Sequence, residues 1–199
     1  MPFTYLALGD SYTIGEQVSL YESFPYQLIQ LLRMSAIDFL APEIIAKTGW
    51  TTNELLSQME QTHFLKNYDW VTLLIGVNNQ YRGSTVENYK PEFEELLKKA
   101  IRFAGNNAAH VVVISIPDWG VTPFAKGRNS NKIAKEIDAY NAAAKEIAST
   151  YDVHYIDITP WTREAATDNS FLAADGLHPS SKEYKRWAEK IAEFFKSRL

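Results

Sequence analysis

The sequence predicts an α/β fold in which helices cover both faces of a parallel sheet. Five short runs have the nearly continuous apolar character of parallel strands that are buried on both sides: residues 3–9, 43–49, 70–76, 110–116 and 153–158. Patterns typical of amphipathic helices alternate with these runs along the chain. Because strands that alternate with helices are joined by right-handed crossovers, the pattern indicates one parallel sheet between helical layers.

The helices have sequence signals of their own. Residues 22–34 place apolar side chains at helical spacing, namely Phe24, Leu28, Leu31 and Leu32. Three later helices are expected to begin at capping boxes, a hydroxyl followed three residues on by glutamate: Thr51/Glu54, Ser84/Glu87 and Ser180/Glu183. A further helix is expected over about 131–149, after the polar loop KGRNSN.

Length and composition predict a single domain over residues 1–199, long enough to hide roughly 70% of its unfolded surface. The net charge of -4 gives no reason to expect nucleic acid or an anionic membrane as a partner. The absence of cysteine excludes disulfides, thiolate metal sites and a cysteine nucleophile.

The N-terminal segment MPFTYLALGD has the pattern of a first strand and not of a secretory leader. No segment approaches the roughly 20 apolar residues that a membrane helix needs. We therefore expect no integral membrane segment and a cytoplasmic location for the chain as given. A chain from which an export signal had been removed would look the same, and nothing in the sequence indicates the oligomeric state.

Polar residues and glycine follow the predicted strands where a ligand site is expected. Ser11 follows the first strand, Gly49 ends the second and Asn78 follows the third. The loop DGLHPS, before the last helix, contains Asp175 and His178. Because open parallel sheets bind ligands beyond the carboxyl ends of their strands, we expect these residues to converge on one rim.

A serine hydroxyl is a poor nucleophile unless a base removes its proton, and the base is most often histidine. His178 is the best candidate, because Asp175 lies three residues before it and can orient the imidazole in a tight turn. The backbone N–H of Ser11, that of Gly49 and the side chain of Asn78 are candidate donors to an oxyanion. The other histidines are expected to be structural or surface residues: His63, His110 and His154.

Other assignments remain open at this point. Asp10 is the immediate neighbour of Ser11 and is expected to be held in the turn, so Asp157 at the end of the last strand is the reserve candidate for the orienting acid. In simpler interpretations, Ser11 is a helix cap, Gly49 is a turn glycine and Asn78 forms an Asx turn.

The segments GDSY, Gly49, GVNN and DGLH resemble, in order and spacing, the four signature blocks of the SGNH (GDSL-type) esterases and lipases. The resemblance extends from Tyr5 to about Ser180. It implies a flavodoxin-like three-layer α/β/α sandwich with five parallel strands in the order 2-1-3-4-5. It also implies a serine esterase that needs no metal and no organic cofactor.

The resemblance assigns a role to each signature residue. Ser11 would be the nucleophile and the first oxyanion donor, and Gly49 and Asn78 would be the remaining donors. His178 would be the base and Asp175 the acid that orients it.

The chain departs from the family pattern at two positions. Tyr12 stands where leucine is frequent, and Asn79 stands where aspartate is frequent. The second departure bears on the electrostatics of that loop more than on activity. The G-x-S-x-G pattern of α/β-hydrolases is absent around Ser11, which separates this prediction from the other large esterase fold.

The predicted function is hydrolysis of a carboxylic ester through an acyl-serine intermediate, with short acyl groups such as acetyl favoured. Candidates for the substrate pocket lie near the same rim: Trp50, Asn79, Tyr81, Arg82, Trp119 and Phe124. These side chains would alternatively serve only to pack the loops.

Two other functions are consistent with the same residues. An acyltransferase would pass the acyl group from Ser11 to an alcohol instead of water. A flavodoxin-like binding module would hold an anion at a helix N-terminus without any chemistry. A receiver domain is set aside, because the third strand is followed by Asn78 and Asn79 and not by a carboxylate.

Overall fold

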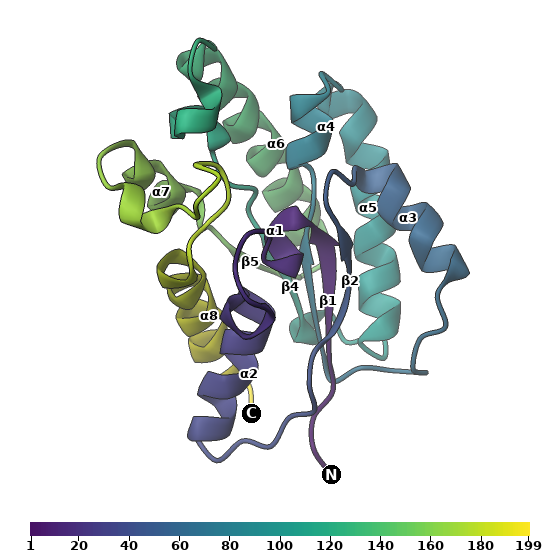
Figure 1. The fold of residues 1–199 in the computed structure, drawn as a ribbon. Coiled ribbons are helices and arrows are strands. Elements are labelled where there is room, and N and C mark those ends of the chain that lie inside the picture. The colour runs from purple at the N-terminus through teal and green to yellow at the C-terminus, as the bar shows by residue number, and fades with distance from the viewer.

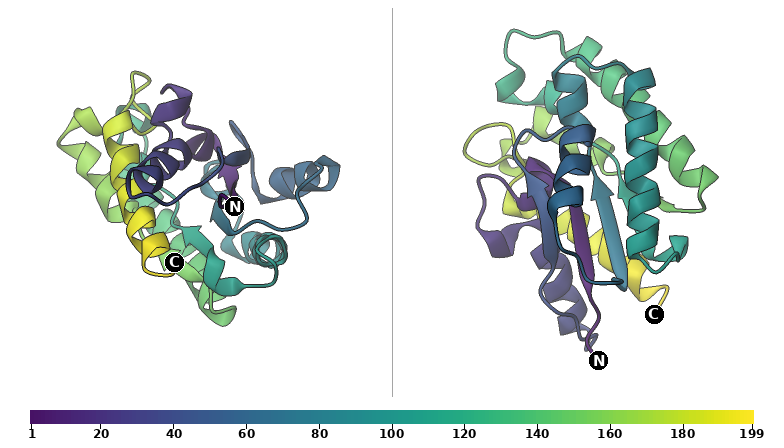
Figure 2. Two further views of the ribbon diagram at one scale, coloured as in Figure 1. Left: turned by 90° about the horizontal axis from the view of Figure 1, so that it is seen from below. Right: turned by 90° about the vertical axis from the view of Figure 1, so that its right-hand side faces the viewer.

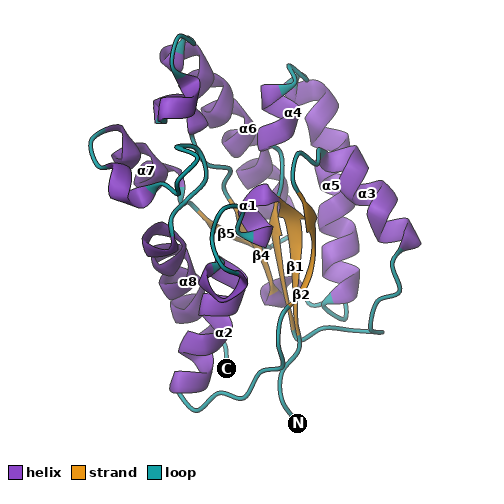
Figure 3. Ribbon diagram, viewed as in Figure 1, coloured by secondary structure: helices purple, strands orange, loops and turns teal.

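The computed structural model describes all residues, 1–199, and contains a five-stranded parallel sheet (Figures 1 and 3). The strands are β1 (Tyr5–Asp10), β2 (Glu43–Lys47), β3 (Trp70–Leu74), β4 (Val111–Ile114) and β5 (His154–Ile156). Their order in the sheet is β2-β1-β3-β4-β5, and every neighbouring pair is parallel. The predicted fold class and strand order are therefore confirmed.

Helices cover both faces of the sheet, as Figure 2 shows from two further directions. On one face α2 (Phe24–Met34) packs against α8 (Ser181–Lys196) (Figure 1). The other face is covered by α3 (Thr52–Gln61), α5 (Val86–Phe103) and α6 (Ser130–Thr150). Three shorter helices follow strands: α1 (Ser11–Ile14), α4 (Val77–Tyr81) and α7 (Thr159–Thr162). None of the helices is both long and apolar enough to cross a membrane.

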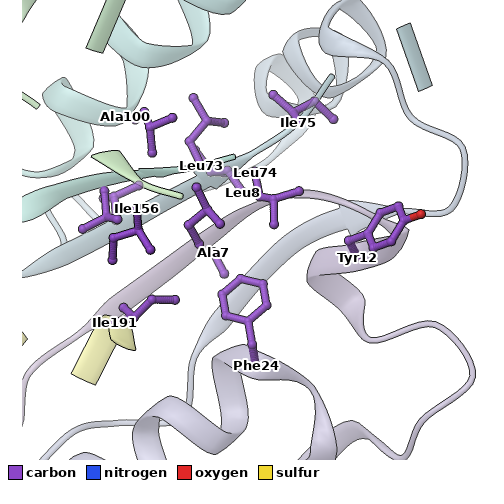
Figure 4. Close-up of a cluster of buried hydrophobic side chains, with 14 of the residues drawn as sticks. Ala7, Leu8, Tyr12, Phe24, Leu73, Leu74, Ile75, Ala100, Ile156 and Ile191 are labelled. Carbon is purple, nitrogen blue, oxygen red and sulfur yellow. The ribbon is translucent and has the colours of Figure 1, made fainter. Parts of the chain in front are cut away.

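The core lies on both sides of the sheet, since the central strands are buried on both faces. Every residue of β1, β3 and β4 is buried, whereas the edge strand β2 is partly exposed. In Figure 4, Phe24 of α2 and Ile191 of α8 lie on one side of β1, the side of Ala7, and Ala100 of α5 lies on the other. Each large apolar side chain buried in this way contributes about 1.5–3 kcal/mol, so the layers hold the strand ends in fixed positions.

The predicted capping boxes have three different outcomes. The box of α3 forms, and the N–H of Thr51 donates to the Glu54 carboxylate at 2.9 Å. The box of α5 was placed one residue too early. Thr85, and not Ser84, is the N-cap, and its hydroxyl accepts from the N–H of Asn88.

For α8 the predicted N-cap, Ser180, is correct but the box does not form. The Ser180 hydroxyl donates to the carbonyl of Ser170 at 2.7 Å. Glu183 points into the protein, where its carboxylate accepts from the indole N–H of Trp187 at 2.8 Å. A tertiary contact therefore replaces the local one.

Candidate active site

The turn after β1 presents Ser11 at the rim of the sheet. Asp10 is the N-cap of α1, and its Oδ1 accepts from the N–H of Tyr12 at 3.0 Å. Gly9 lets the helix fold back closely on the strand. A Cβ on Gly9 would lie 2.1 Å from Oγ1 of Thr13 and 2.5 Å from the carbonyl oxygen of Leu74. The sequence Gly-Asp-Ser therefore combines a close approach, an N-cap and a buried first turn whose serine lines the rim pocket.

The loop before α8 brings a histidine to this serine. Nε2 of His178 lies 3.0 Å from Oγ of Ser11, and Nδ1 of His178 lies 2.6 Å from Oδ2 of Asp175. The other carboxylate oxygen of Asp175 accepts from the N–H groups of Leu177 and His178, both at 3.0 Å. Carboxylate, imidazole and hydroxyl thus form one hydrogen-bonded chain between the two ends of the sequence.

The surroundings of Asp175 favour its charged form. Partial burial opposes ionisation, but the hydrogen bonds from His178 and Leu177 outweigh it and lower the pKa of Asp175 below its ordinary value. The His178 side chain is almost buried, and its ring packs against that of Tyr12 with 5.1 Å between centroids. A charged carboxylate and a packed ring together fix the orientation of the imidazole.

Three N–H donors face the same region. Ser11 is the first residue of α1, so its backbone N–H has no acceptor within the helix. Gly49 has φ +83°, a conformation that favours glycine, and its N–H donates to no acceptor within the protein. The amide of Asn78 donates to the carbonyl of Trp50 at 3.0 Å and makes a longer contact, 3.4 Å, to Oδ2 of Asp10. Asn78 therefore reaches across the rim instead of forming an Asx turn.

Around these groups lies a pocket of about 170 Å³, the reaction pocket. The residues that line it come from the segments after β1, β2, β3 and β4 and from the loop before α8: Ser11, Tyr12, Thr48, Gly49, Val77, Asn78, Tyr81, Trp119, Phe124, Leu177 and His178. Trp119 is held in place by a hydrogen bond of 2.7 Å from its indole N–H to Gln80. Most of the wall is apolar, and the polar groups gather at Ser11.

The family model for the GDSL-like lipase/acylhydrolase family matches residues 7–186. The chain belongs to this family. It is accordingly an ester-hydrolysing enzyme with an α/β fold.

Relatives of this hydrolase agree with the assignment. A spore germination lipase from Bacillus licheniformis is 24% identical over 96% of this chain and 95% of its own length. A lipase/acylhydrolase from Enterococcus faecalis has a similar structure, with a TM-score of 0.72, 24% identity and coverage of 100% of this chain and 97% of its own. An acetylxylan esterase from Geobacillus stearothermophilus has a TM-score of 0.74 at 16% identity, covering 96% and 93%. At these identities the two solved structures support the fold alone.

Half of the predicted pocket residues do not line the pocket of the hydrolase: Trp50, Asn79 and Arg82. Trp50 packs against the core. Arg82 donates to the carbonyl of Gly49 at 2.6 Å and pairs with Glu54. The remaining candidates, Tyr81, Trp119 and Phe124, do line it.

Asn79 instead joins α4 to the start of α3. Its side-chain oxygen accepts from the N–H of Thr52 at 3.1 Å, and its amide donates to the Thr52 hydroxyl at 2.7 Å. Asn79 is buried, and these two hydrogen bonds hold the start of α4 against the start of α3.

The reserve candidate for the orienting acid, Asp157, lies apart from His178 in the hydrogen-bond network. Asp157 accepts from the hydroxyl of Ser115 at 2.9 Å and from the N–H of Thr159 at 3.1 Å, and it makes no hydrogen bond to His178. Asp10 is held in the turn, as expected.

The other histidines take no part in the pocket. His110 stacks on Trp70 with 4.5 Å between ring centroids, and His154 stacks on Phe194 at 3.8 Å. Both lie at the amino ends of their strands, away from the rim.

Sequence reasoning missed four residues of the pocket wall: Tyr12, Thr48, Val77 and Leu177. Each is the immediate neighbour of a predicted site residue. Adjacent residues of a short turn can line the same pocket. The positions next to each predicted site residue could therefore have been named as candidates for the pocket wall.

Proposed function

We propose that the protein is a serine-dependent carboxylic ester hydrolase that works through an acyl-Ser11 intermediate and prefers short acyl groups such as acetyl. The observation that carries the proposal is the hydrogen-bonded chain from Ser11 through His178 to Asp175. Such a chain supplies what a serine hydroxyl lacks, a base oriented by a charged carboxylate.

In the first half of the reaction, Nε2 of His178 takes the proton of Ser11 as the serine oxygen attacks the ester carbonyl. The resulting imidazolium is stabilised by the Asp175 carboxylate. His178 then gives this proton to the alcohol oxygen, the bond from the carbonyl carbon to that oxygen breaks, and the acyl group stays on Ser11. A water molecule, deprotonated by the same imidazole, attacks the acyl carbon; the bond from that carbon to Oγ of Ser11 then breaks, His178 returns the proton to Oγ, and the acid leaves.

The negative oxygen of each tetrahedral intermediate is bound by the N–H groups of Ser11 and Gly49 and by the amide of Asn78. The N–H of Gly49 has no competing acceptor. The contact of Asn78 to Asp10, at 3.4 Å, is long enough to be exchanged for the oxyanion while the bond to Trp50 is kept.

Two observations support a short acyl group. The reaction pocket, about 170 Å³, is small, and four aromatic side chains form part of its wall: Tyr12, Tyr81, Trp119 and Phe124. A protein with a similar structure is an acetylxylan esterase, whose name records an acetyl ester as substrate.

The test combines covalent labelling with turnover. A fluorophosphonate probe is expected to label Ser11, and Ser11→Ala is expected to lower the kcat for p-nitrophenyl acetate by about 10⁴-fold or more. Ser180→Ala, at a hydroxyl outside the pocket, serves as the control and should be labelled normally. Persistent labelling of Ser11→Ala would refute the proposal. Added alcohols separate the activities, since a hydrolase releases mainly the free acid and an acyltransferase releases mainly the new ester.

A further inference from the structure

A second, smaller cavity adjoins the reaction pocket. Three side chains line both spaces: Tyr12, Trp119 and Leu177. The second cavity is small, about 20 Å³, which is room for roughly one water molecule. The three shared side chains therefore form a partition, named so from here on, between the reaction pocket at Ser11 and this second cavity.

The partition is held firmly. Tyr12 and Trp119 are 3% and 4% exposed, so neither ring has room to swing aside. The Trp119 indole is fixed by Gln80, whose own amide donates to Glu136 at 2.8 Å. Tyr12 belongs to the tight first turn of α1, and its ring packs against His178.

The order of product release indicates which part of the substrate faces the partition. The alcohol leaves first, while the acyl group remains attached to Ser11. The opposite side of the reaction pocket carries Tyr81 and Phe124, which are 43% and 44% exposed and mark an open mouth. An alcohol that points toward this mouth can leave while the acyl group stays on Ser11, and in this orientation the acyl chain points toward the partition.

We propose that the partition, and Tyr12 above all, limits the length of the acyl chain that the site accepts. The inference rests on the proposed acyl-Ser11 mechanism and names its substrate class as esters of short carboxylic acids. Removing the outer part of the Tyr12 ring would join the two spaces and admit further methylene groups.

The second cavity is suited to a hydrocarbon chain once it is opened. Part of its wall is apolar, formed by Ala165, Phe171 and Leu172. Its two carboxylates already have partners, because Asp118 accepts from Arg163 at 2.9 Å and Glu183 accepts from Trp187 at 2.8 Å. An entering acyl chain would therefore leave no additional charge unpaired.

The experiment compares kcat/KM for p-nitrophenyl acetate, butyrate, hexanoate and octanoate in the wild type, Tyr12→Leu and Tyr12→Phe. Each newly buried methylene is worth about fourfold in binding. Tyr12→Leu is expected to raise the ratio of octanoate to acetate at least about tenfold. Tyr12→Phe keeps the ring and removes only the hydroxyl, so its ratio should stay within about twofold of the wild type.

Further variants keep the test decisive. Leu177→Ala opens the partition from another side and replaces Tyr12→Leu if thermal melting shows that the latter does not fold. Leu172→Ala enlarges only the second cavity and should leave the ratio unchanged. Adding Leu172→Phe to Tyr12→Leu should refill the space and reverse the gain.

The inference is overturned if folded Tyr12→Leu and Leu177→Ala both keep the wild-type ratio. It is also overturned if these variants gain on acetates of long alcohols instead of on long acyl chains. Neither result bears on the proposed acyl-Ser11 mechanism, which has its own test. Activity retained by Ser11→Ala refutes the acyl-Ser11 mechanism, whereas unchanged ratios in an enzyme that needs Ser11 refute only the partition.

Discussion

Two aspartates flank the pair of Ser11 and His178, and their surroundings shift their pKa values in opposite directions. Asp175 lies in the loop before α8, with a quarter of its side chain exposed and three hydrogen bonds from Leu177 and His178. Asp10 lies in the turn after β1, has no exposed surface, and receives one good hydrogen bond, from the N–H of Tyr12. Its contact to the amide of Asn78 is long.

The pKa values follow these surroundings. Burial raises the pKa of Asp10 to about 7, and the hydrogen bonds from Tyr12 and Asn78 offset it only in part. The pKa of Asp175 is lowered, because its donors outweigh partial burial. Asp10 is the closer neighbour of Ser11 in the chain, yet Asp175 has the surroundings of an orienting acid. Proximity to the serine therefore matters less than the number and geometry of the donors around the carboxylate.

The largest effect should come from removing the charge that orients His178. Asp175→Asn keeps the size of the side chain but no longer favours the imidazole with its proton on Nδ1, so kcat for p-nitrophenyl acetate should fall by about 10³- to 10⁴-fold. The matched control is Asp157→Asn, whose carboxylate contacts Ser115 and Thr159 only. A loss below about tenfold in Asp175→Asn would mean that the exposed carboxylate is dispensable.

A smaller loss of kcat is expected from replacing Asn78, the proposed oxyanion donor whose amide lies 3.4 Å from Oδ2 of Asp10. Asn78→Ala removes one of three donors and should lower kcat by about 10²- to 10³-fold with little change in KM. Asn79→Ala, its neighbour in α4, is the control, because its amide bonds Thr52 and not the pocket. The control should lower the melting temperature but change kcat less than about tenfold. Equal losses of kcat in the two variants would show that Asn78 acts only by shaping the loop.

The same comparison explains what the sequence could predict. Asp175 and His178 are three residues apart, so a local turn creates their contact, and the spacing alone indicates it. The strands and the parallel sheet follow from the alternation of apolar runs and helical patterns, which is likewise local, whereas the strand order was predicted only through the resemblance to the SGNH family. Contacts between residues that are close in the chain can therefore be recognised from a sequence motif.

Contacts between distant segments were not predictable in this way. Trp119 was expected near the pocket, but the hydrogen bond that holds its indole there goes to Gln80, 39 residues earlier, and had no signal in the sequence. Arg82 was expected to line the pocket but turns to the carbonyl of Gly49. The high pKa of Asp10 likewise depends on tertiary packing that removes its carboxyl from solvent. None of these partners lies within a turn of the residue it positions.

The smallest and most specific effect concerns stability and not turnover. Below about pH 4 the carboxyl of Asp10 is neutral in both the folded and the unfolded chain. Between this pH and about 7 the unfolded chain loses the proton while the folded protein keeps it. Over this range the folded protein binds more protons than the unfolded chain. Asp10 therefore lowers the free energy of unfolding progressively as the pH rises, until the pH reaches the pKa of Asp10 in the folded protein, about 7.

Asp10→Asn should remove this dependence and preserve the turn, because asparagine is an equally good N-cap for the N–H of Tyr12. The free energy of unfolding in urea, measured at about pH 4.5 and about pH 7.5, should fall more in the wild type than in the variant, by on the order of a few kcal/mol. If both proteins show the same pH dependence, Asp10 ionises as readily in the folded protein as in the unfolded chain. The two aspartates would then both be charged during turnover, and the donors around Asp175 would no longer distinguish the orienting acid from its neighbour.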